Sequence, residues 1–476
     1  MGDKLIVAMP IPLNDLTSPP LFTAADLRGI ERRWAAQHPG HALMDAAGTT
    51  AAELASGLAL DTGAPVLVLA GPGNNGGDAL VAARGLVARG HAVVVASRAD
   101  PHRLPPDAAA AWAAWQAAGG AVRRELPAAI NFSLVVDGLY GVGLTREVAG
   151  EDARWIAAVN ALPCPRLALD LPSGLDGDTG SIHGCAVRAD HTLSFIGLKP
   201  GLFTADGPDV VGTVWLAPLG VEPGLLPDVA GSALVQLSPR HRLPPRRHNS
   251  HKGDYGRVGL VGAAPGLVGA GLIAGRAALL QGAGSVTVAS LDDRVVVDYG
   301  EPRLMFAPPE QLVAQSLDAL AIGPGLGRSP RAAALLDAAV DAPCPLVLDA
   351  DALNLLAATP AQMPRLAART APTLMTPHPG EAARLLGTTP SAIQANRIDA
   401  ARRLSALAGA HVALKGAGSV IAHPDGRYVV NTSGGPWLAQ AGAGDRLTGM
   451  VLALLGQGLA PGDALEAAVW LHGCSA

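Results

Sequence analysis

Glycine-rich and acidic motifs in the first half of the chain have the residue types needed to bind an anion and to move a proton. The apolar run Val66–Ala70 leads directly into GPGNNGGD (71–78), which is followed by a helical pattern. Glycines at this point would let backbone N–H groups approach a phosphate at the positive end of the helix. Two other apolar runs end in the carboxylates Asp137 and Asp170. Parallel strands bring their carboxyl ends to one edge of a sheet, so the three motifs are predicted to share a crevice.

The two amides of the glycine-rich loop, Asn74 and Asn75, set it apart from an ordinary nucleotide-binding turn. Their oxygens could hold a cation and their N–H groups a ligand, although both side chains could instead cap the following helix. The loop also satisfies G-x-G-x-x-G, which is a weak signal by itself. Because SRAD (97–100) after the next predicted strand is an ambiguous ribose-binding segment, a dehydrogenase is less favoured.

The acidic residues near the third motif are interpreted differently from one another. Asp170 stands at a strand end before LPSG (171–174) and is interpreted as a catalytic acid or base. Asp176 and Asp178, in LDGDTG, are typical of turn residues that accept hydrogen bonds from their own backbone.

A phosphoryl-transfer site is indicated near the end of the chain. GAGD (442–445) opens a helical pattern whose N–H groups and dipole could hold phosphate charge, with Asp445 as the base for an accepting hydroxyl. Lys415 lies in a second glycine turn, KGAGS, and could reach the phosphates of a nucleotide. Only four of the 35 basic residues are lysines, which raises the functional weight of Lys415, Lys199 and Lys252. The alternative for KGAGS is a solvated surface turn.

Three further motifs follow predicted strands in the same half: GPGLG (323–327), DADALN (349–354) and TPHPGE (376–381). The prolines beside His378 fix its backbone, so this side chain could be a rigid ligand contact or simply a satisfied loop histidine. The residues alone leave both interpretations open.

Apolar strand-like runs alternate with Ala- and Leu-rich helical stretches, which is typical of a doubly wound α/β fold. Helices are predicted within 23–60 and from about 442 to 473. Strands are predicted at Val66–Ala70, Ala92–Ala96, Ser133–Asp137, Arg166–Asp170, Arg257–Val261, Ser285–Ser290, Ala319–Gly323, Pro345–Asp349, Thr373–Thr376 and His411–Lys415. The alternation fails from about Leu219 to Ser250, around PRHRLPPRRHNSHKG, which predicts an exposed linker and two domains, 1–230 and 231–476.

The composition limits the kinds of partner that are expected for this protein. A formal charge of −5, 49% apolar and 16% charged residues describe a globular chain rather than a disordered one. Without a basic stripe, and with only 7 Trp, 4 Tyr and 5 Phe for stacking, nucleic acid is not expected as the main partner. Four widely spaced cysteines without a C-x-x-C pair predict a reducing, cytoplasmic location and no zinc site. Neither a signal peptide nor a membrane-spanning segment is predicted.

The motifs of the first half, GPGNNGGD, VVDGLYGVG and LDLPSGLDGDTG, together with LMDAAG (43–48), resemble those of the NAD(P)H-hydrate epimerase domain, a Rossmann-like fold, over roughly residues 20–220. The resemblance implies that Asp170 is the acid/base group acting at C6 of the hydrated ring, and that Asn75, Asp137 and Ser173 hold a potassium ion. It implies that the hydrated nucleotide binds to Asn74, Asn75, Gly76, Gly77, Asp78, Gly141, Val142, Gly143, Leu144, Thr145, Arg146, Glu147 and Asp170.

The motifs of the second half, GPGLG, DADALN, TPHPGE, KGAGS and GAGD, resemble those of the ribokinase-like ADP/ATP-dependent NAD(P)H-hydrate dehydratase domain, from roughly residue 240 onward. The resemblance implies contacts of the hydrate with Ala270, Gly325, His378 and Asp445. It implies contacts of the adenine nucleotide with Lys415, Gly416, Ala417, Gly418, Ser419 and Gly444. The order of the two modules also matches the fused bacterial enzymes of this family.

The combined resemblance implies a repair enzyme that epimerises R and S NAD(P)H hydrate and dehydrates the S form with ADP or ATP and Mg²⁺, giving AMP and phosphate from ADP. Its partners would be small molecules, and a homo-oligomer is expected. One alternative is a sugar or vitamin kinase of ribokinase-like fold fused to a nucleotide-binding regulatory domain, because a fold does not fix a substrate. Another is a module that only senses nicotinamide nucleotides. That alternative draws on two departures from the family pattern, Ala79 in place of a glycine and GGPW (434–437) in place of an Asn-Pro-Gly-Met-like run.

Overall fold

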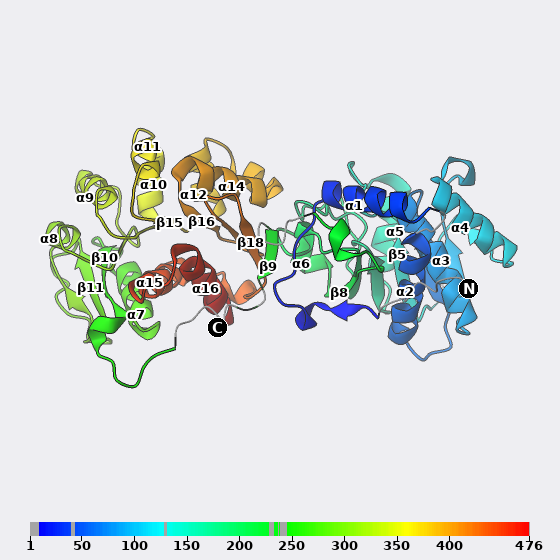
Figure 1. Cartoon of the computed structure of the whole chain (residues 1–476), viewed down its shortest axis with the longest axis horizontal. Coiled ribbons are helices and arrows are strands. Elements are labelled where there is room, and N and C mark those ends of the chain that lie inside the picture. Colours follow the sequence, from blue (N-terminus) through cyan, green and yellow to red (C-terminus); the bar gives the residue numbers. More distant parts are fainter. Residues whose placement is uncertain are drawn as a thin grey trace. The chain divides into compact units, whose positions relative to one another are not determined.

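The computed structural model describes residues 9–39, 43–127, 131–227, 233–236, 238 and 245–475. The chain forms two compact units, Met1–Gly231 and Ser232–Ala476, whose elements are labelled in Figure 1. The division lies directly beside the domain boundary predicted after residue 230. Each unit is built on one sheet with helices packed against it, so the predicted α/β class is confirmed.

The described residues of the N-terminal unit form an eight-stranded sheet that is parallel except for its first strand. Across the sheet the order is β1 (Ile11–Pro12), β8 (Thr213–Ala217), β7 (His191–Phe195), β6 (Arg166–Leu169), β5 (Leu134–Gly138), β2 (Val66–Ala70), β3 (Val93–Ala96) and β4 (Val122–Arg123). Its helices are α1 (Ala24–Gln37), α2 (Leu43–Leu58), α3 (Asn74–Ala88), α4 (Pro106–Ala117), α5 (Gly150–Asn160) and α6 (Gly207–Val210). The central parallel strands therefore carry their carboxyl ends to one edge.

Both faces of this sheet are buried, because successive side chains of a strand point to opposite faces. In β2, Val66 and Val68 join the core formed with α2, α3 and α4. Leu67 and Leu69 join a second core with α5. A strand buried on both faces is apolar at every position, which explains why VLVLA was recognisable from sequence.

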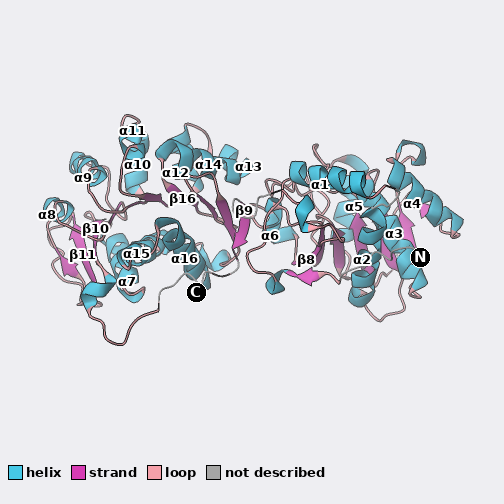
Figure 2. Cartoon of the chain, in the orientation of Figure 1, coloured by secondary structure: helices cyan, strands magenta, loops and turns pink. Residues whose placement is uncertain are grey.

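The described residues of the C-terminal unit form a ten-stranded mixed sheet. Its order is β12 (Met305–Phe306), β11 (Ser285–Ser290), β10 (Arg257–Gly262), β13 (Ala319–Ile322), β14 (Leu346–Leu348), β15 (Thr373–Met375), β16 (His411–Leu414), β17 (Val420–Ala422), β18 (Tyr428–Asn431) and β9 (Ala233–Gln236). The helices are α7 (Val268–Leu280), α8 (Pro309–Val313), α9 (Pro330–Val340), α10 (Asp351–Ala358), α11 (Gln362–Ala367), α12 (Pro379–Leu386), α13 (Pro390–Ala395), α14 (Arg397–Ala408), α15 (Ala443–Gly456) and α16 (Pro461–Cys474). Helices α7, α15 and α16 form the core on one face, and Figure 2 shows α10, α12 and α14 on the other.

One sequence prediction in the interdomain region is wrong. The stretch from Leu219 to Ser250 was expected to be linker, yet β9 lies within it and pairs in parallel with β18. Residues 228–232, 237 and 239–244 of this stretch lie outside the described residues. Strand β9 is recognisable only from its partner, because a four-residue segment between proline-rich runs has little strand pattern of its own.

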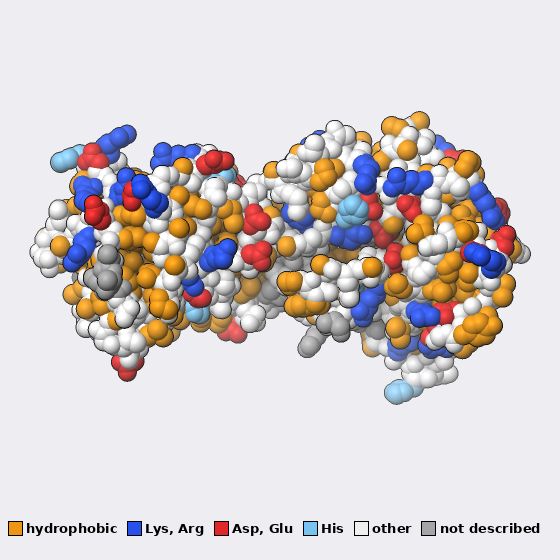
Figure 3. Space-filling view, turned by 180° about the vertical axis from the view of Figure 1, so that it is seen from behind, with side chains coloured by type: hydrophobic (Ala, Val, Ile, Leu, Met, Phe, Trp, Pro, Cys, Tyr) orange, Lys and Arg blue, Asp and Glu red, His pale blue; other side chains and the backbone are white. Residues whose placement is uncertain are grey.

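The surface is mixed in character. Figure 3 shows acidic and basic side chains interspersed among apolar ones on the face in view. None of the helices in the described part of the chain has the length and hydropathy of a transmembrane segment.

Candidate active sites

A pocket of about 760 Å³ lies at the carboxyl ends of β2, β5 and β6 in the N-terminal unit. It is lined by most of the residues predicted for that site: Asn74, Asn75, Asp78, Gly141, Val142, Gly143, Leu144, Thr145, Arg146 and Asp170. Helix α1 adds Arg28, Glu31 and Trp34 to the wall, none of which the sequence interpretation singled out. The strand-end motifs therefore do meet in one crevice.

The glycine-rich loop is shorter than the sequence pattern indicated. Helix α3 begins at Asn74, directly after an extended Gly73, so the amides lie in its first turn. Neither amide caps the helix, which makes the capping alternative wrong. Gly71 is required by close approach, since a Cβ there would lie 1.7 Å from the Leu139 carbonyl oxygen.

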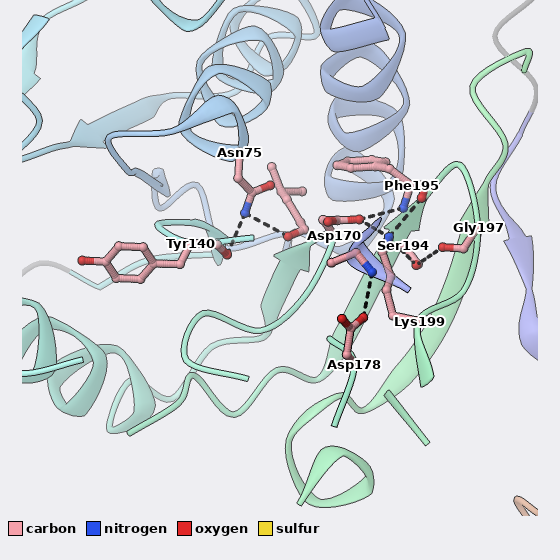
Figure 4. A network of polar contacts seen from close by, with 10 residues as sticks. Asn75, Tyr140, Asp170, Asp178, Ser194, Phe195, Gly197 and Lys199 are labelled. Atoms are coloured by element: carbon pink, nitrogen blue, oxygen red, sulfur yellow. Dashed lines mark hydrogen bonds and ion pairs between the residues drawn. The ribbon is translucent and has the colours of Figure 1, made fainter. Parts of the chain in front are cut away.

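Asn75, Asp137 and Ser173 are brought together around the backbone of Tyr140. Asn75 Nδ2 donates to the carbonyl oxygens of Tyr140 (2.9 Å) and Leu169 (3.0 Å), as Figure 4 shows. Ser173 Oγ accepts from Tyr140 N (2.8 Å) and donates to Asp137 Oδ1 (2.7 Å). Asn75 Oδ1 is buried and has no hydrogen-bond partner among the described residues.

Asp137 is a buried carboxylate at the end of β5. It accepts hydrogen bonds from Ser173 N (2.8 Å), Ser173 Oγ and Leu139 N (3.2 Å). Burial raises the pKa of Asp137 to about 6, and these hydrogen bonds oppose the rise. A positive charge beside it would offset the remaining cost of burial.

Asp170 is held by a lysine that the sequence interpretation did not assign to this site. Lys199 Nζ donates to Asp170 Oδ1, to Ser194 Oγ (3.0 Å) and to the carbonyl oxygen of Phe195 (3.0 Å), as Figure 4 shows. The Lys199 side chain is fully buried, whereas 14% of the Asp170 side chain stays exposed. The ammonium therefore binds the carboxylate from its buried side, and the carboxylate faces the pocket.

The backbone of Asp170 has a left-handed conformation. Its φ of +65° is in the left-handed region, where side chains other than glycine, Asn and Asp are rare. Its N–H donates to the Leu193 carbonyl oxygen (2.8 Å), and Oδ1 accepts from Phe195 N (3.2 Å). These two hydrogen bonds hold the backbone in this conformation.

Asp78 adds another carboxyl group to the same pocket. Burial, and then the charges of Asp170 and Glu31, raise the pKa of Asp78 well above its ordinary value. A carboxyl group with a raised pKa in a pocket is typical of acid/base sites.

Asp178 does not act as predicted. Asp176 does bind its own turn, accepting from Asp178 N (3.0 Å) and Thr179 N (2.8 Å), so that prediction is confirmed. Asp178 Oδ1 instead accepts from Ala24 N (2.7 Å) at the start of α1. Figure 4 shows this contact, which fixes a wall of the pocket to the LDGDTG loop.

Three predicted contact residues are not among those that line the pocket. Gly76 packs against Gly71 and Gly77 against Met44, where a Cβ would lie 2.1 and 2.5 Å from neighbouring atoms. Glu147 is an exposed loop residue. The two glycines therefore serve helix packing in this structure.

The departure at Ala79 does not crowd the pocket. The Ala79 side chain is buried, and its methyl group lies 2.6 Å from where a Cβ on Gly138 would be. It therefore occupies the space that the glycine at the end of β5 leaves free.

The C-terminal unit brings its motifs together at the carboxyl ends of β14 and β16. Lys415 Nζ donates to Asp349 Oδ1 (2.9 Å). A Cβ on Gly444, in the first turn of α15, would lie 3.1 Å from the same Nζ. Lys415 therefore points at the helix start that carries Asp445, with the KGAGS turn beside it.

Asp445 lies in the first turn of α15, because that helix begins at Ala443. Burial and the charge of Asp349 raise the pKa of Asp445 to about 6, while Lys415 lowers it and Asp351 raises it further. Burial also disfavours the charge of Lys415, but Asp349, Glu381 and Asp445 together raise its pKa above the ordinary value. An acid/base carboxylate and a fixed cation thus share one site.

Two further contacts join other residues predicted for this site. The turn 415–419 begins beside the TPHPGE motif, since Lys415 N donates to the Pro377 carbonyl oxygen (2.9 Å). Gly325 and Ala270 are neighbours, with the Ala270 Cβ 3.2 Å from where a Cβ on Gly325 would be.

His378 caps helix α12. Its Nδ1 accepts from Gly380 N (3.0 Å), and its Nε2 lies 3.2 Å from Glu381 Oε1. Half of the side chain is exposed. The structure therefore gives His378 the contacts of a capping residue and leaves part of its ring accessible.

Comparison with known proteins assigns both units. A family model described as YjeF-related protein N-terminus matches residues 40–201, and one described as NAD(P)H-hydrate dehydratase matches residues 258–476. The bifunctional NAD(P)H-hydrate repair enzyme Nnr of Escherichia coli (strain K12) is 39% identical over 428 residues, which cover 86% of this chain and 80% of that protein. This chain belongs to the bifunctional NAD(P)H-hydrate repair enzymes. The resemblance drawn from the motifs is thereby confirmed.

Other members of the NAD(P)H-hydrate repair family match over a similar length. The bifunctional repair enzyme Nnr of Moorella thermoacetica is 38% identical, with 86% of this chain and 82% of that protein covered. Among solved structures, the ADP/ATP-dependent NAD(P)H-hydrate dehydratase of Bacillus subtilis, co-crystallised with ATP and Mg²⁺, is 32% identical with a TM-score of 0.44. It covers 50% of this chain and 85% of its own. A ribokinase-like superfamily protein of Enterococcus faecalis is 27% identical with the same TM-score and the same coverage.

Two charged residues that bind a predicted site residue were also missed, Lys199 and Asp349. The scarcity of lysine was the one sequence signal that pointed to Lys199. Asp349 was noticed within DADALN but received no role. Only the structure pairs them with Asp170 and Lys415, the residues that carry the motifs.

Proposed function

We propose that the N-terminal unit epimerises the R and S forms of NAD(P)H hydrate, and that the C-terminal unit dehydrates the S form to NAD(P)H with ADP, giving AMP and phosphate. The observation that carries the proposal is that each unit holds its own carboxylate at the carboxyl edge of its sheet, Asp170 above Lys199 and Asp445 beside Lys415. Membership of the bifunctional repair family supports both activities.

In the epimerase site, Asp170 is the group that accepts and returns a proton as the configuration at C6 of the hydrated ring changes. A positioned carboxylate contributes to such a step because it is held within reach of the proton. Lys199 keeps Asp170 in place, and the 141–146 segment and the start of α3 line the space for the nucleotide.

In the dehydratase site, Asp445 removes the proton of the ring hydroxyl, whose oxygen then attacks the terminal phosphorus of ADP and releases AMP. Lys415 and the N–H groups at the start of α15 stabilise the phosphate charge that develops. The ring nitrogen lone pair then expels phosphate by breaking the C–O bond, and loss of a neighbouring ring proton restores the dihydropyridine.

Magnesium would accompany the nucleotide. Within the described residues no group of three or more His, Cys, Asp or Glu side chains is arranged to bind a metal ion. The side chains therefore do not form a magnesium cage, and Mg²⁺ that travels with a nucleotide takes phosphate and water oxygens as ligands.

Potassium fits the N-terminal site. Asn75 Oδ1 is a buried oxygen without a hydrogen-bond partner in the described part of the chain, whereas Nδ2 of the same amide donates to two carbonyl oxygens. Together with Asp137 and Ser173 it offers the hard oxygen ligands that such a cation prefers. These three residues would hold K⁺ and fix the loops that face the nucleotide.

Potassium is expected to stabilise the N-terminal unit, because a ligand that binds only the folded state adds stability by mass action. At a hundredfold excess over its Kd the gain would be about 2.7 kcal/mol. Thermal unfolding in potassium chloride, compared with tetramethylammonium chloride at equal ionic strength, measures it. The increment should vanish in Asn75→Ala, and an equal increment in that variant would contradict the site.

The test of the whole proposal uses separated R and S hydrates. With the S form, recovery of reduced-nicotinamide absorbance is expected only when a nucleotide is added, and with the R form only after a lag for epimerisation. Running ADP and ATP in parallel identifies the phosphoryl donor. A stable phosphorylated product would instead support the kinase alternative, and binding without turnover would support the sensor.

Two further properties stay predictions from the sequence. All four cysteines are free thiols, which is compatible with the predicted cytoplasmic location. Homo-oligomerisation also stays a prediction.

A further inference from the structure

Asp349 is a buried charge in the C-terminal unit that the proposed chemistry leaves without a role. Its side chain is 1% exposed. Oδ1 accepts from Lys415 Nζ (2.9 Å), and Oδ2 accepts from Thr448 Oγ1 (2.7 Å). The Asp349 carboxylate therefore binds both the KGAGS turn, through Lys415, and helix α15, through Thr448. Thr448 lies about one helical turn after Asp445.

The DADALN motif that contains Asp349 also reaches the other motifs. Asp351 Oδ2 accepts from Gly327 N (2.9 Å) in GPGLG. Asn354 Oδ1 accepts from Arg384 Nη1 (2.8 Å) in α12, the helix that follows TPHPGE. The residue between the two aspartates, Ala350, has φ +51°, a left-handed conformation that alanine rarely adopts. The strained turn sends the two carboxylates to different partners.

We propose that Asp349 is a positioning residue of the dehydratase site, which holds the Lys415 ammonium against the start of α15 so that it is ready for a nucleotide phosphate. This inference rests on the proposed nucleotide role of Lys415. Lysine is a flexible side chain that loses rotamer entropy when it is fixed, and a fully buried carboxylate that is itself held by Thr448 fixes it before the nucleotide binds.

The charges around Asp445 agree with this role. The groups that face this part of the site are Asp349, Lys415 and Asp351 around Asp445, Glu381 from α12 near Lys415, and His472 of α16 with Arg446 beside the helix start. Next to burial, Asp349 has the largest raising effect on the pKa of Asp445, which is raised to about 6. Deprotonated Asp445 is the active base, so dehydration should be lost as pH falls through about 6.

Asp349→Asn tests the proposal in the full-length protein. Without the buried negative charge the pKa of Asp445 falls, and Lys415, released from its partner, lowers it further. The acid limb of kcat/KM for the S hydrate should therefore move to lower pH by about one unit. The KM for ADP should rise about tenfold, because a charge-assisted hydrogen bond no longer holds Lys415. A purely structural role would not move the acid limb, and a folded variant in which either quantity stays unchanged overturns the proposal.

Thr448→Val covers the case in which Asp349→Asn does not fold. It removes the second hydrogen bond of Asp349 but keeps the charge, so the KM for ADP should rise about threefold while the acid limb stays in place. An unchanged KM in this variant overturns the proposal. The matched control is Asp341→Asn, an exposed carboxylate paired with Arg365 on the surface, which should alter neither quantity.

The same measurements separate this inference from the proposed function. If the wild-type protein dehydrates the S hydrate without any nucleotide, the nucleotide role of Lys415 is wrong. If wild type needs ADP and Asp349→Asn behaves like wild type, only the positioning role is wrong.

Discussion

Asp445→Asn is expected to abolish the nucleotide-dependent recovery of NAD(P)H from the S hydrate while epimerisation continues at the wild-type rate. The substitution preserves the size of the side chain but removes its ability to accept a proton. General-base catalysis accounts for about 10²- to 10⁴-fold of a rate, so dehydration should fall by about a thousandfold. Coupled absorbance assays on each pure epimer measure the two activities separately.

The physical reason for the size of this effect is the position of Asp445. It is partly buried at the start of α15, where water is a poor substitute for a missing base. Lys415 and the helix N–H groups remain in the variant, so nucleotide affinity should change little. A parallel loss of ADP binding would show that Asp445 supports the nucleotide rather than the proton transfer.

Asp170→Asn should produce the opposite result. Epimerisation is expected to fall by about a thousandfold, whereas dehydration of supplied S hydrate should be unaffected because it takes place in the other unit. Asparagine tolerates the left-handed backbone at this position, so the substitution tests the carboxylate without imposing new strain. A mixture of the R and S hydrates should then be repaired only in part, with the R form left over.

Lys199 makes this second variant informative. Replacing Asp170 by asparagine leaves a fully buried ammonium without a counter-charge, with only neutral acceptors such as Ser194 Oγ and the Phe195 carbonyl oxygen. The unpaired charge should lower the stability of the N-terminal unit, since removing one partner of a buried pair is costly. The double variant Asp170→Asn with Lys199→Met should recover stability but not epimerisation. Recovery of both would show that Asp170 serves only as a counter-ion, and equal loss of both repair activities in either single variant would contradict the two-site assignment.

Much of the fold was accessible from sequence because its central strands are apolar at every position. Strands such as Val66–Ala70 and Ser285–Ser290 were predicted with the bounds observed. Strands β1, β4, β7, β8, β9, β12, β17 and β18 were missed. The hairpin of β17 and β18 and the edge strand β9 depend on pairing with each other and with β16, so their stability is not encoded in the local pattern.

The motifs by themselves were enough to identify the family and both carboxylates. Glycine turns, strand-end acids and helix starts are formed by consecutive residues, so they can be recognised in the sequence. What only the tertiary structure decided is which distant charge each motif residue meets. Lys199 beneath Asp170, Asp178 at the start of α1, and Asp349 between Lys415 and Thr448 are pairs separated by many residues. These contacts are needed because a buried charge without a partner is costly. The partner can come from any part of the chain that the fold brings close, so its position cannot be read from the order of the residues.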